Sequence, residues 1–208
     1  VPPNLDRSRK YPLVVSLHAE DTSPQMCLMR VFGQTNRLAD GSLAPLRFFR
    51  GRDVDVIVAC PLSRGTMGYE GIAERDVYDV VADVKRRFPV DEDRVYLTGI
   101  AMGGGGALRL ALTRPDVWAA VALVCPIVPA GLEGLIPNAL NLPVRLYQGE
   151  LDPLVPAEGV RLWQRHLLDL GVPTDYIEYP TGRHNAWDYA YKDGAIFDWF
   201  SHFRRNRN

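Results

Sequence analysis

Three short segments carry the residues that could do chemistry, and each directly follows an apolar run. The first, Gly99-Ile100-Ala101-Met102-Gly103, keeps the glycine spacing of the motif G-x-S-x-G but has alanine at its centre. In that motif a sharp strand-to-helix turn presents a serine hydroxyl above a sheet. The other two segments contain Asp152 and His184. The chain therefore offers the frame of a nucleophile turn, then an acid, then a histidine, with no nucleophile in the frame.

These residue types belong together for a chemical reason. A serine hydroxyl is a poor nucleophile until an imidazole takes its proton, and a carboxylate must fix the tautomer of that imidazole and stabilise its cation. A structural alternative for the first segment is a glycine-rich turn that packs a helix closely on a strand. A dinucleotide or phosphate loop is disfavoured, since G-x-G-x-x-G fits no register and no Lys-Ser/Thr pair follows.

Apolar runs that alternate with helix-period segments would position these residues. The strands are expected at 13–17, 54–59, 95–98, 119–124, 144–147 and 176–179, and helices at 77–88, through 108–112, at 160–170 and at 195–203. Strands that are apolar throughout indicate a parallel sheet covered on both faces. We therefore expect one α/β domain over residues 1–208, with three layers and a mostly parallel sheet of about six strands. Catalytic groups gather at the carboxyl ends of such strands.

The chain resembles the esterase domains of the α/β-hydrolase superfamily, in the branch of polyhydroxybutyrate-depolymerase-like, feruloyl-esterase-like and prolyl-oligopeptidase-like proteins. The resemblance is most specific over Asp91–Cys125, and it extends to NLPVRLYQGELDPLVP around the acid and PTDYIEYPTGRHNAWDYAYKDGAIFDWF near the end. It implies an α/β-hydrolase fold in which Asp152 and His184 are the catalytic acid and base. Ala101 takes the place of the family's serine.

The resemblance also implies an oxyanion hole, made by the backbone N–H of Met102 and that of Ala19 or Glu20. Here the chain departs from its relatives, because the first strand ends in His18-Ala19 where the family usually has His-Gly. A backbone donor survives that exchange while φ stays negative. Gln148 is another departure, since many relatives have histidine there.

Other polar and aromatic residues have weaker functional interpretations. Arg64 and Tyr69 follow the second strand at the level of the site and could touch substrate. Trp187 and the tyrosines that follow it in the sequence, Tyr189 and Tyr191, could line an acyl or aryl pocket, although core packing explains these aromatics equally well. His18 is expected to support the oxyanion loop, and the two remaining histidines, His166 and His202, are expected to be structural or solvated.

Composition excludes several classes of protein. The 208 residues include 24 basic and 25 acidic side chains, with no basic stripe of the kind that binds nucleic acid. We expect the basic end, Arg204-Arg205-Asn206-Arg207, to be a solvated tail and not a binding arm. No apolar run approaches the 18 residues of a membrane span. Cys27, Cys60 and Cys125 fit no zinc or redox spacing. We expect them to be small buried hydrophobes, and we expect no metal or cofactor.

The predicted function is hydrolysis of a carboxylic ester through an acyl-enzyme, in a chain that Ala101 renders inactive. Ala101 could be an exchange made in an active esterase, which the retained glycines and acid–histidine pair favour. It could also mark a natural pseudoenzyme that binds a ligand or partner. A serine peptidase of prolyl-oligopeptidase type is a weaker alternative. The substrate would be a small-molecule or polysaccharide-linked ester, and the sequence leaves its identity and the oligomeric state open.

The start at Val1 leads us to expect a longer parent polypeptide with further strands upstream. A secreted or periplasmic location is slightly favoured over a cytoplasmic one.

Overall fold

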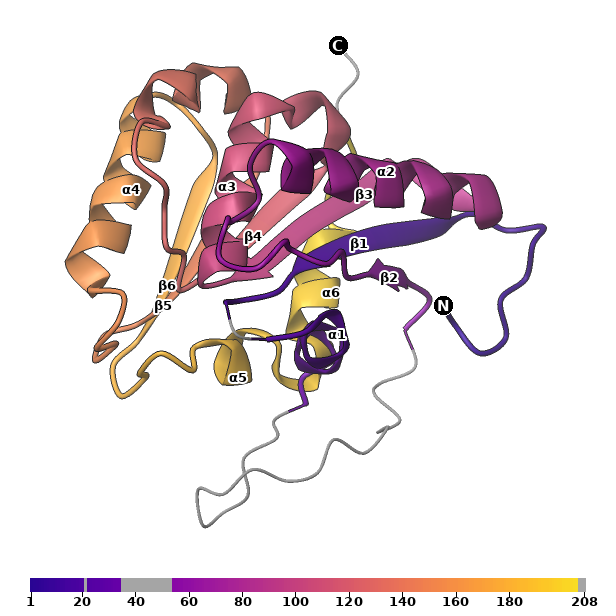
Figure 1. Ribbon diagram of the computed structural model, residues 1–208, viewed down its shortest axis with the longest axis horizontal. Coiled ribbons are helices and arrows are strands. Elements are labelled where there is room, and N and C mark those ends of the chain that lie inside the picture. Colours follow the sequence, from indigo (N-terminus) through magenta and orange to yellow (C-terminus); the bar gives the residue numbers. More distant parts are fainter. Residues whose placement is uncertain (21, 35–53, 206–208) are drawn as a thin grey trace.

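A parallel sheet of six strands forms the centre of the protein (Figure 1). The computed structural model describes residues 1–20, 22–34 and 54–205. The strands run in the spatial order β2-β1-β3-β4-β5-β6, and every neighbouring pair is parallel. Their bounds are β1 Tyr11–Leu17, β2 Ile57–Ala59, β3 Val90–Ile100, β4 Ala120–Val124, β5 Val144–Gly149 and β6 Thr174–Tyr179. The sheet predicted from the apolar runs is confirmed.

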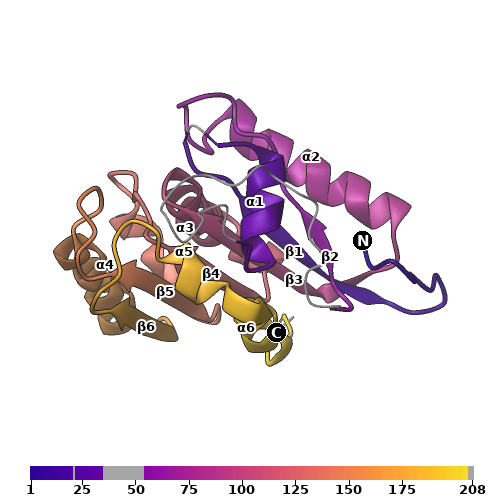
Figure 2. The same ribbon diagram turned by 90° about the horizontal axis from the view of Figure 1, so that it is seen from below.

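Helices cover both faces of this sheet, as the continuous apolar strands require. Helices α2, α3 and α4 lie over one face, and α1, α5 and α6 lie over the other (Figures 1 and 2). The α-helices are α1 Pro24–Val31, α2 Ile72–Arg87, α3 Met102–Thr113, α4 Ala157–Asp169, α5 Trp187–Ala190 and α6 Ala195–Ser201. Short 3-10 helices are η1 Pro115–Val117, η2 Glu133–Ala139 and η3 Lys192–Gly194.

The core has two halves because alternate strand residues point to opposite faces. In β1, Leu13 and Val15 join the cluster that packs under α2, α3 and α4, while Val14 joins the cluster on the other face. In β4, Val121 and Ala122 divide in the same way. Strands that contribute to both halves, such as β4, are therefore apolar at successive positions.

The strand expected at 54–59 is shorter than its sequence indicates. Only Ile57–Ala59 pairs with β1, through Leu13–Val15. The Val56 N–H donates instead to the Val54 carbonyl oxygen at 2.8 Å, so the chain turns there before β2 pairs with β1 as the outermost strand. This local bond replaces the ladder bonds that a longer strand would make.

Two helices were missed by the periodicity argument because both are short. Ser23 begins α1, since its hydroxyl accepts from the Met26 N–H at 3.2 Å, and Pro24 occupies the first helical position. Both are ordinary helix-start signals. The other missed helix, α5, has four residues and follows His184 closely.

All six strands run in the same direction, so their carboxyl ends share one edge of the sheet. Leu17, Ile100, Val124, Gly149 and Tyr179 are the last residues of five of them. The predicted site segments begin at this edge. No helix in the described parts of the chain combines the length and apolarity needed to cross a membrane.

Candidate active site

Ala101 occupies a strained turn between β3 and α3. Its φ is 50° and its ψ is −114°, which a residue with a Cβ rarely adopts. The turn is fixed by its backbone: the Ala101 N–H donates to Val124 O, and its carbonyl oxygen accepts from Gly105 and Ile127, all at 3.0 Å. A Cβ on Gly99 would lie 2.1 Å from Gly103 O. The predicted elbow geometry is confirmed, including the need for glycine at both flanking positions.

Four consecutive glycines open α3, although each costs a helix about 1 kcal/mol relative to alanine. The packing explains them, because a Cβ at any of the four would meet a different part of the fold within about 3 Å. Gly103 faces Leu17 O at 2.2 Å, Gly104 faces Pro126, Gly105 faces Ile127 O at 1.8 Å, and Gly106 faces the ring of Tyr69. The first turn of α3 is thus pressed against the end of β1 and the loop after β4.

The end of β1 is held in place by His18. The Ser63 N–H donates to Nε2 of His18 at 2.8 Å, so the ring proton must be on Nδ1, which lies 2.8 Å from Ala19 O. The Tyr69 hydroxyl donates to the His18 carbonyl oxygen at 3.2 Å. His18 therefore stabilises the segment expected to carry one oxyanion donor. The roles of Ala19, Glu20 and Met102 in such a hole stay a prediction.

One carboxylate oxygen of Asp152 accepts from backbone N–H groups, and the other contacts His184. Oδ1 accepts from the N–H groups of Leu154 and Val155, both at 2.9 Å. Oδ2 lies 2.8 Å from Nδ1 of His184, and Gln148 Nε2 donates to it at 3.3 Å. Because the carboxylate accepts, Nδ1 of His184 carries a proton, and in the neutral ring Nε2 keeps the lone pair that can accept another. The predicted contact between acid and histidine is confirmed.

Close backbone packing brings these two loops together. A Cβ on Gly149, at the end of β5, would lie 2.3 Å from the carbonyl oxygen of Arg183 and 2.6 Å from Gly182. The Leu151 N–H also donates to Gly182 O at 2.9 Å. The loop after β6 thus lies directly on the loop after β5, which explains why His184 reaches Asp152 across 32 positions of sequence.

His184 is partly open to solvent, whereas the Asp152 side chain is closed off. Their side chains are 21% and 0% exposed. The ring of Trp187 meets the His184 ring edge-on with centroids 5.8 Å apart, and the Arg30 guanidinium stacks over Trp187 at 4.4 Å. Trp187 therefore helps to orient the imidazole, and its contact with substrate stays a prediction.

The other two candidate substrate residues, Tyr69 and Arg64, differ in their exposure. Tyr69 is 1% exposed, with its ring against Gly106, so the expectation that it touches substrate is not supported. Burial raises its pKa strongly. Arg64 is exposed and forms a two-bond ion pair with Asp76 on α2, with Nε 2.6 Å from Oδ2. It borders a hollow of about 600 Å³ beside Leu62.

Among the aromatics after His184, Tyr191 is buried in the core with its hydroxyl 2.8 Å from Thr98 Oγ1, whereas Tyr189 is exposed and stacks on Tyr179. Of the two histidines expected to be structural or solvated, His166 is half-buried on α4 and His202 is exposed just after α6.

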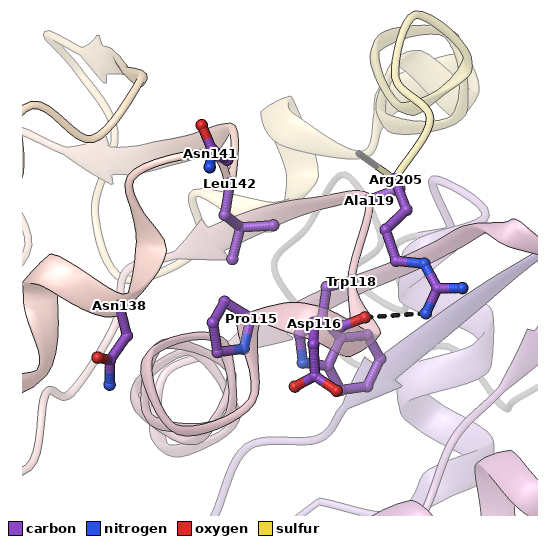
Figure 3. Close-up of a pocket in the computed structure, with 8 residues that line it drawn as sticks. All are labelled: Pro115, Asp116, Trp118, Ala119, Asn138, Asn141, Leu142 and Arg205. Atoms are coloured by element: carbon purple, nitrogen blue, oxygen red, sulfur yellow. Dashed lines mark hydrogen bonds between the residues drawn. The ribbon is translucent and has the colours of Figure 1, made fainter. Parts of the chain in front are cut away.

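A second hollow, of about 210 Å³, lies at the opposite edge of the sheet (Figure 3). It is bordered by Ala119 and Leu142, which precede β4 and β5, and by Arg205, whose guanidinium donates to Asp116 O at 2.9 Å. The Arg205 side chain is thus bound to the fold and not a solvated tail as predicted; Asn206 and Arg207 lie outside the described residues. No residue of the candidate site borders this hollow.

Two residues at the site were not predicted from the sequence. Gln148 is buried and uses its amide N–H₂ to hold Asp152 and the carbonyl oxygens of Gly149 and Val155. Cys125 follows β4 with a φ of 37° and directs its Sγ toward the same loops. The sequence signals were that both lie at the carboxyl end of a strand and that Gln148 stands where many relatives have histidine.

Residues 78–192, more than half of the chain, match the family model "Esterase", described as "Putative esterase". The chain belongs to this esterase family. The matched range includes Ala101, Asp152 and His184. Among curated relatives of this esterase-family chain, "Putative esterase NocK" of Nocardia uniformis subsp. tsuyamanensis is 38% identical over 81 residues, which cover 39% of this chain and 23% of that protein. The "Poly(3-hydroxyoctanoate) depolymerase" of Pseudomonas fluorescens is 29% identical over 122 residues, covering 54% and 42%.

Solved structures agree on the fold of this esterase-family chain. A thermostable esterase matches with a TM-score of 0.76 and 23% identity, covering 99% of this chain and 58% of that one. A ferulic acid esterase matches with a TM-score of 0.63 and 15% identity, covering 93% and 84%. The expected α/β-hydrolase fold is confirmed. The chain spans less than half the length of the two curated relatives it matches.

Proposed function

We propose that this fold hydrolyses carboxylic esters through an acyl-enzyme when a serine stands at position 101, and that the chain with Ala101 binds the ester without turning it over. One observation carries the proposal. The Asp152–His184 pair, with Nδ1 and Oδ2 2.8 Å apart, lies at the same sheet edge as a strained elbow at φ 50°. A positive φ is strained at a residue with a Cβ, and a turn of this kind presents the nucleophile in the G-x-S-x-G motif.

The proposed reaction assigns one role to each group. Nε2 of His184, free to accept, takes the proton of a hydroxyl at position 101 as the oxygen attacks the ester carbonyl. Asp152 stabilises the imidazolium through Nδ1–H. The N–H groups of Met102 and of Ala19 or Glu20 would stabilise the oxyanion. His184 then gives the proton to the leaving alcohol, and water, activated by the same imidazole, releases the acid.

The substrate class remains broad. A feruloyl or acetyl ester on a plant polysaccharide fits the aromatic Trp187 beside His184, since aromatic rings pack on one another. The polyester-depolymerase relative favours an aliphatic ester instead. Location outside the cytoplasm would suit either substrate.

Steady-state kinetics on four proteins test the proposal: the chain itself, Ala101→Ser, and Ala101→Ser combined with His184→Ala or with Asp152→Ala. Only Ala101→Ser should hydrolyse p-nitrophenyl or methyl hydroxycinnamate esters. Loss of the serine alone costs about 10⁶-fold in kcat in the subtilisin triad, so the chain as it stands should be nearly inert. Each double variant should lose most of the gain. Hydrolysis by the His184→Ala double variant at the full rate would contradict the assigned roles.

A binding module is the second candidate, because Ala19 and Ala101 both depart from the catalytic pattern beside one site. A folded Ala101→Ser variant that is inactive on a broad ester panel would favour it. The codon at position 101 in the parent gene would separate an introduced alanine from a natural one.

A further inference from the structure

Cys125 is a buried thiol at the centre of the candidate site that the proposed reaction does not use. It follows β4 directly, is 0% exposed, and has a positive φ of 37° that turns the chain toward Asp152 and His184. Its thiol donates to the His184 carbonyl oxygen at 3.7 Å. Burial, and next the negative charge of Asp152, raise the pKa of the Cys125 thiol. The thiol is therefore neutral and poorly reactive as it stands.

The Sγ of Cys125 shares its surroundings with two further metal-ligating atoms. A sulfur from Cys125, a carboxylate oxygen from Asp152 and a ring nitrogen from His184 all lie within 4.8 Å of one another. Thiolate, imidazole and carboxylate are the three protein ligand types of Zn²⁺, with bonds of about 2.0–2.3 Å. Tetrahedral ligands at those distances lie about 3.3–3.8 Å apart. Small side-chain shifts would close the cluster around one cation.

We propose that Cys125, Asp152 and His184 form a site for one thiophilic divalent cation, such as Zn²⁺ or Cd²⁺. The existing contacts of these residues favour cation binding. The N–H groups of Leu154 and Val155 hold Asp152 through Oδ1, which leaves Oδ2 for the cation. The partly exposed ring of His184 provides the entry. The three ligands come from loops after β4, β5 and β6, so no sequence spacing could have indicated the site.

Binding would change the protonation of two of the three ligands, Cys125 and His184. The Cys125 thiol releases its proton to solvent and bonds as a thiolate. The ring proton of His184 leaves Nδ1, which binds the cation, and appears on Nε2. The cation thus replaces the Asp152–His184 hydrogen bond and removes the lone pair that a catalytic base needs. The cation site shares Asp152 and His184 with the proposed ester hydrolysis, but cation binding can be measured separately, on the chain with Ala101.

The chain also provides an internal control. Cys27 and Cys60 form a pair of thiols away from this site, in which the hydrogen bond from Cys60 lowers the pKa of Cys27. Ser16 Oγ lies 3.1 Å from the Cys27 sulfur. This pair offers no nearby imidazole or carboxylate among the described residues that could complete a cation site.

Calorimetric titration with Zn²⁺, and ultraviolet absorption during titration with Cd²⁺, test the proposal on four proteins: the chain, Cys125→Ala, Asp152→Asn, and Cys27→Ala with Cys60→Ala. The chain should bind one cation with a thiolate-to-metal absorption band, and the Cys27/Cys60 variant should do the same. Cys125→Ala should lose the band and at least about 100-fold in affinity, the upper end of what even an outer-shell partner contributes.

Circular dichroism checks that each variant is folded. If Cys125→Ala does not fold, Asp152→Asn decides, because it keeps the thiol and weakens the site by at least about 10-fold. Absence of binding to the unmodified chain, unchanged binding in Cys125→Ala, or a band that disappears only in the Cys27/Cys60 variant would each overturn the proposal. None of these outcomes bears on the ester hydrolysis test.

Discussion

Gly103→Ala tests whether the elbow is assembled by close backbone packing. The added Cβ would lie 2.2 Å from Leu17 O, more than 1 Å short of the 3.4 Å at which ordinary contact begins, and 2.7 Å from His18 O. Both are backbone atoms: Leu17 is the last residue of β1 and pairs with β3, and His18 follows it directly, so neither atom can rotate away as a side chain could. Overpacking of this kind costs about 3 kcal/mol, and the better helix propensity of alanine returns about 1 kcal/mol.

The net loss in free energy of unfolding is therefore about 2 kcal/mol, which lowers Tm by roughly 4–8 °C in a chain of this size. Urea unfolding, followed by circular dichroism, measures the free energy of unfolding. Gly134→Ala in η2 is the matched control, because a Cβ there meets nothing within 4 Å and its φ is not positive. That variant should stay within about 1 kcal/mol of the unmodified chain. If Gly103→Ala proves as stable as Gly134→Ala, the close-packing argument for the elbow is wrong.

The remaining predictions concern alkaline stability and the acid loop. Tyr191 and Tyr69 are buried, and burial raises the pKa of both phenols. Above pH 10 the unfolded chain loses phenolic protons that the folded chain keeps, so the free energy of unfolding should fall by up to about 1.4 kcal/mol per pH unit for each. Urea midpoints from pH 9 to 11 measure this, and an equally steep fall in Tyr191→Phe would refute it. Gly149→Ala in the Ala101→Ser background should lower kcat/KM at least about 10-fold. The added Cβ would lie 2.3 Å from the carbonyl oxygen of Arg183, the residue before His184, and would displace the imidazole. Gly159→Ala, in open space on α4, is the control, and equal activity of the two variants would contradict the argument.

The parts of the site that depend on local sequence could be predicted, and those that depend on packing between distant loops could not. The elbow around Ala101 is local, because flanking glycines and the strand-to-helix change specify it. The order of Asp152 and His184 after successive strands placed them at one edge of the sheet. The resemblance marked position 148 as a departure but gave Gln148 no role, and Cys125 was expected only to be a buried hydrophobe. Their roles arise only where the end of β5 meets the loops after β4, β5 and β6.

Residue type alone could not place the aromatic and cationic residues near the site. Tyr69 and Trp187 are equally suited by composition to a pocket or to a core. Tyr69 proved to be buried because Gly106 leaves room for its ring, and His18 O accepts from its hydroxyl. Arg64 forms an ion pair with Asp76, one turn into α2, and the periodicity of the sequence did not indicate this contact.

The central claim is that position 101 is a nucleophile site served by His184. Intact-mass measurement of the Ala101→Ser variant after treatment with an aryl fluorophosphonate tests it most directly, because such probes phosphonylate a serine only where a base activates it. We expect one covalent adduct per chain, mapped by peptide sequencing to position 101, with none on the unmodified chain and much slower labelling when His184→Ala is added. An Ala101→Ser protein that is folded yet unlabelled, or labelled equally fast without His184, would contradict the account.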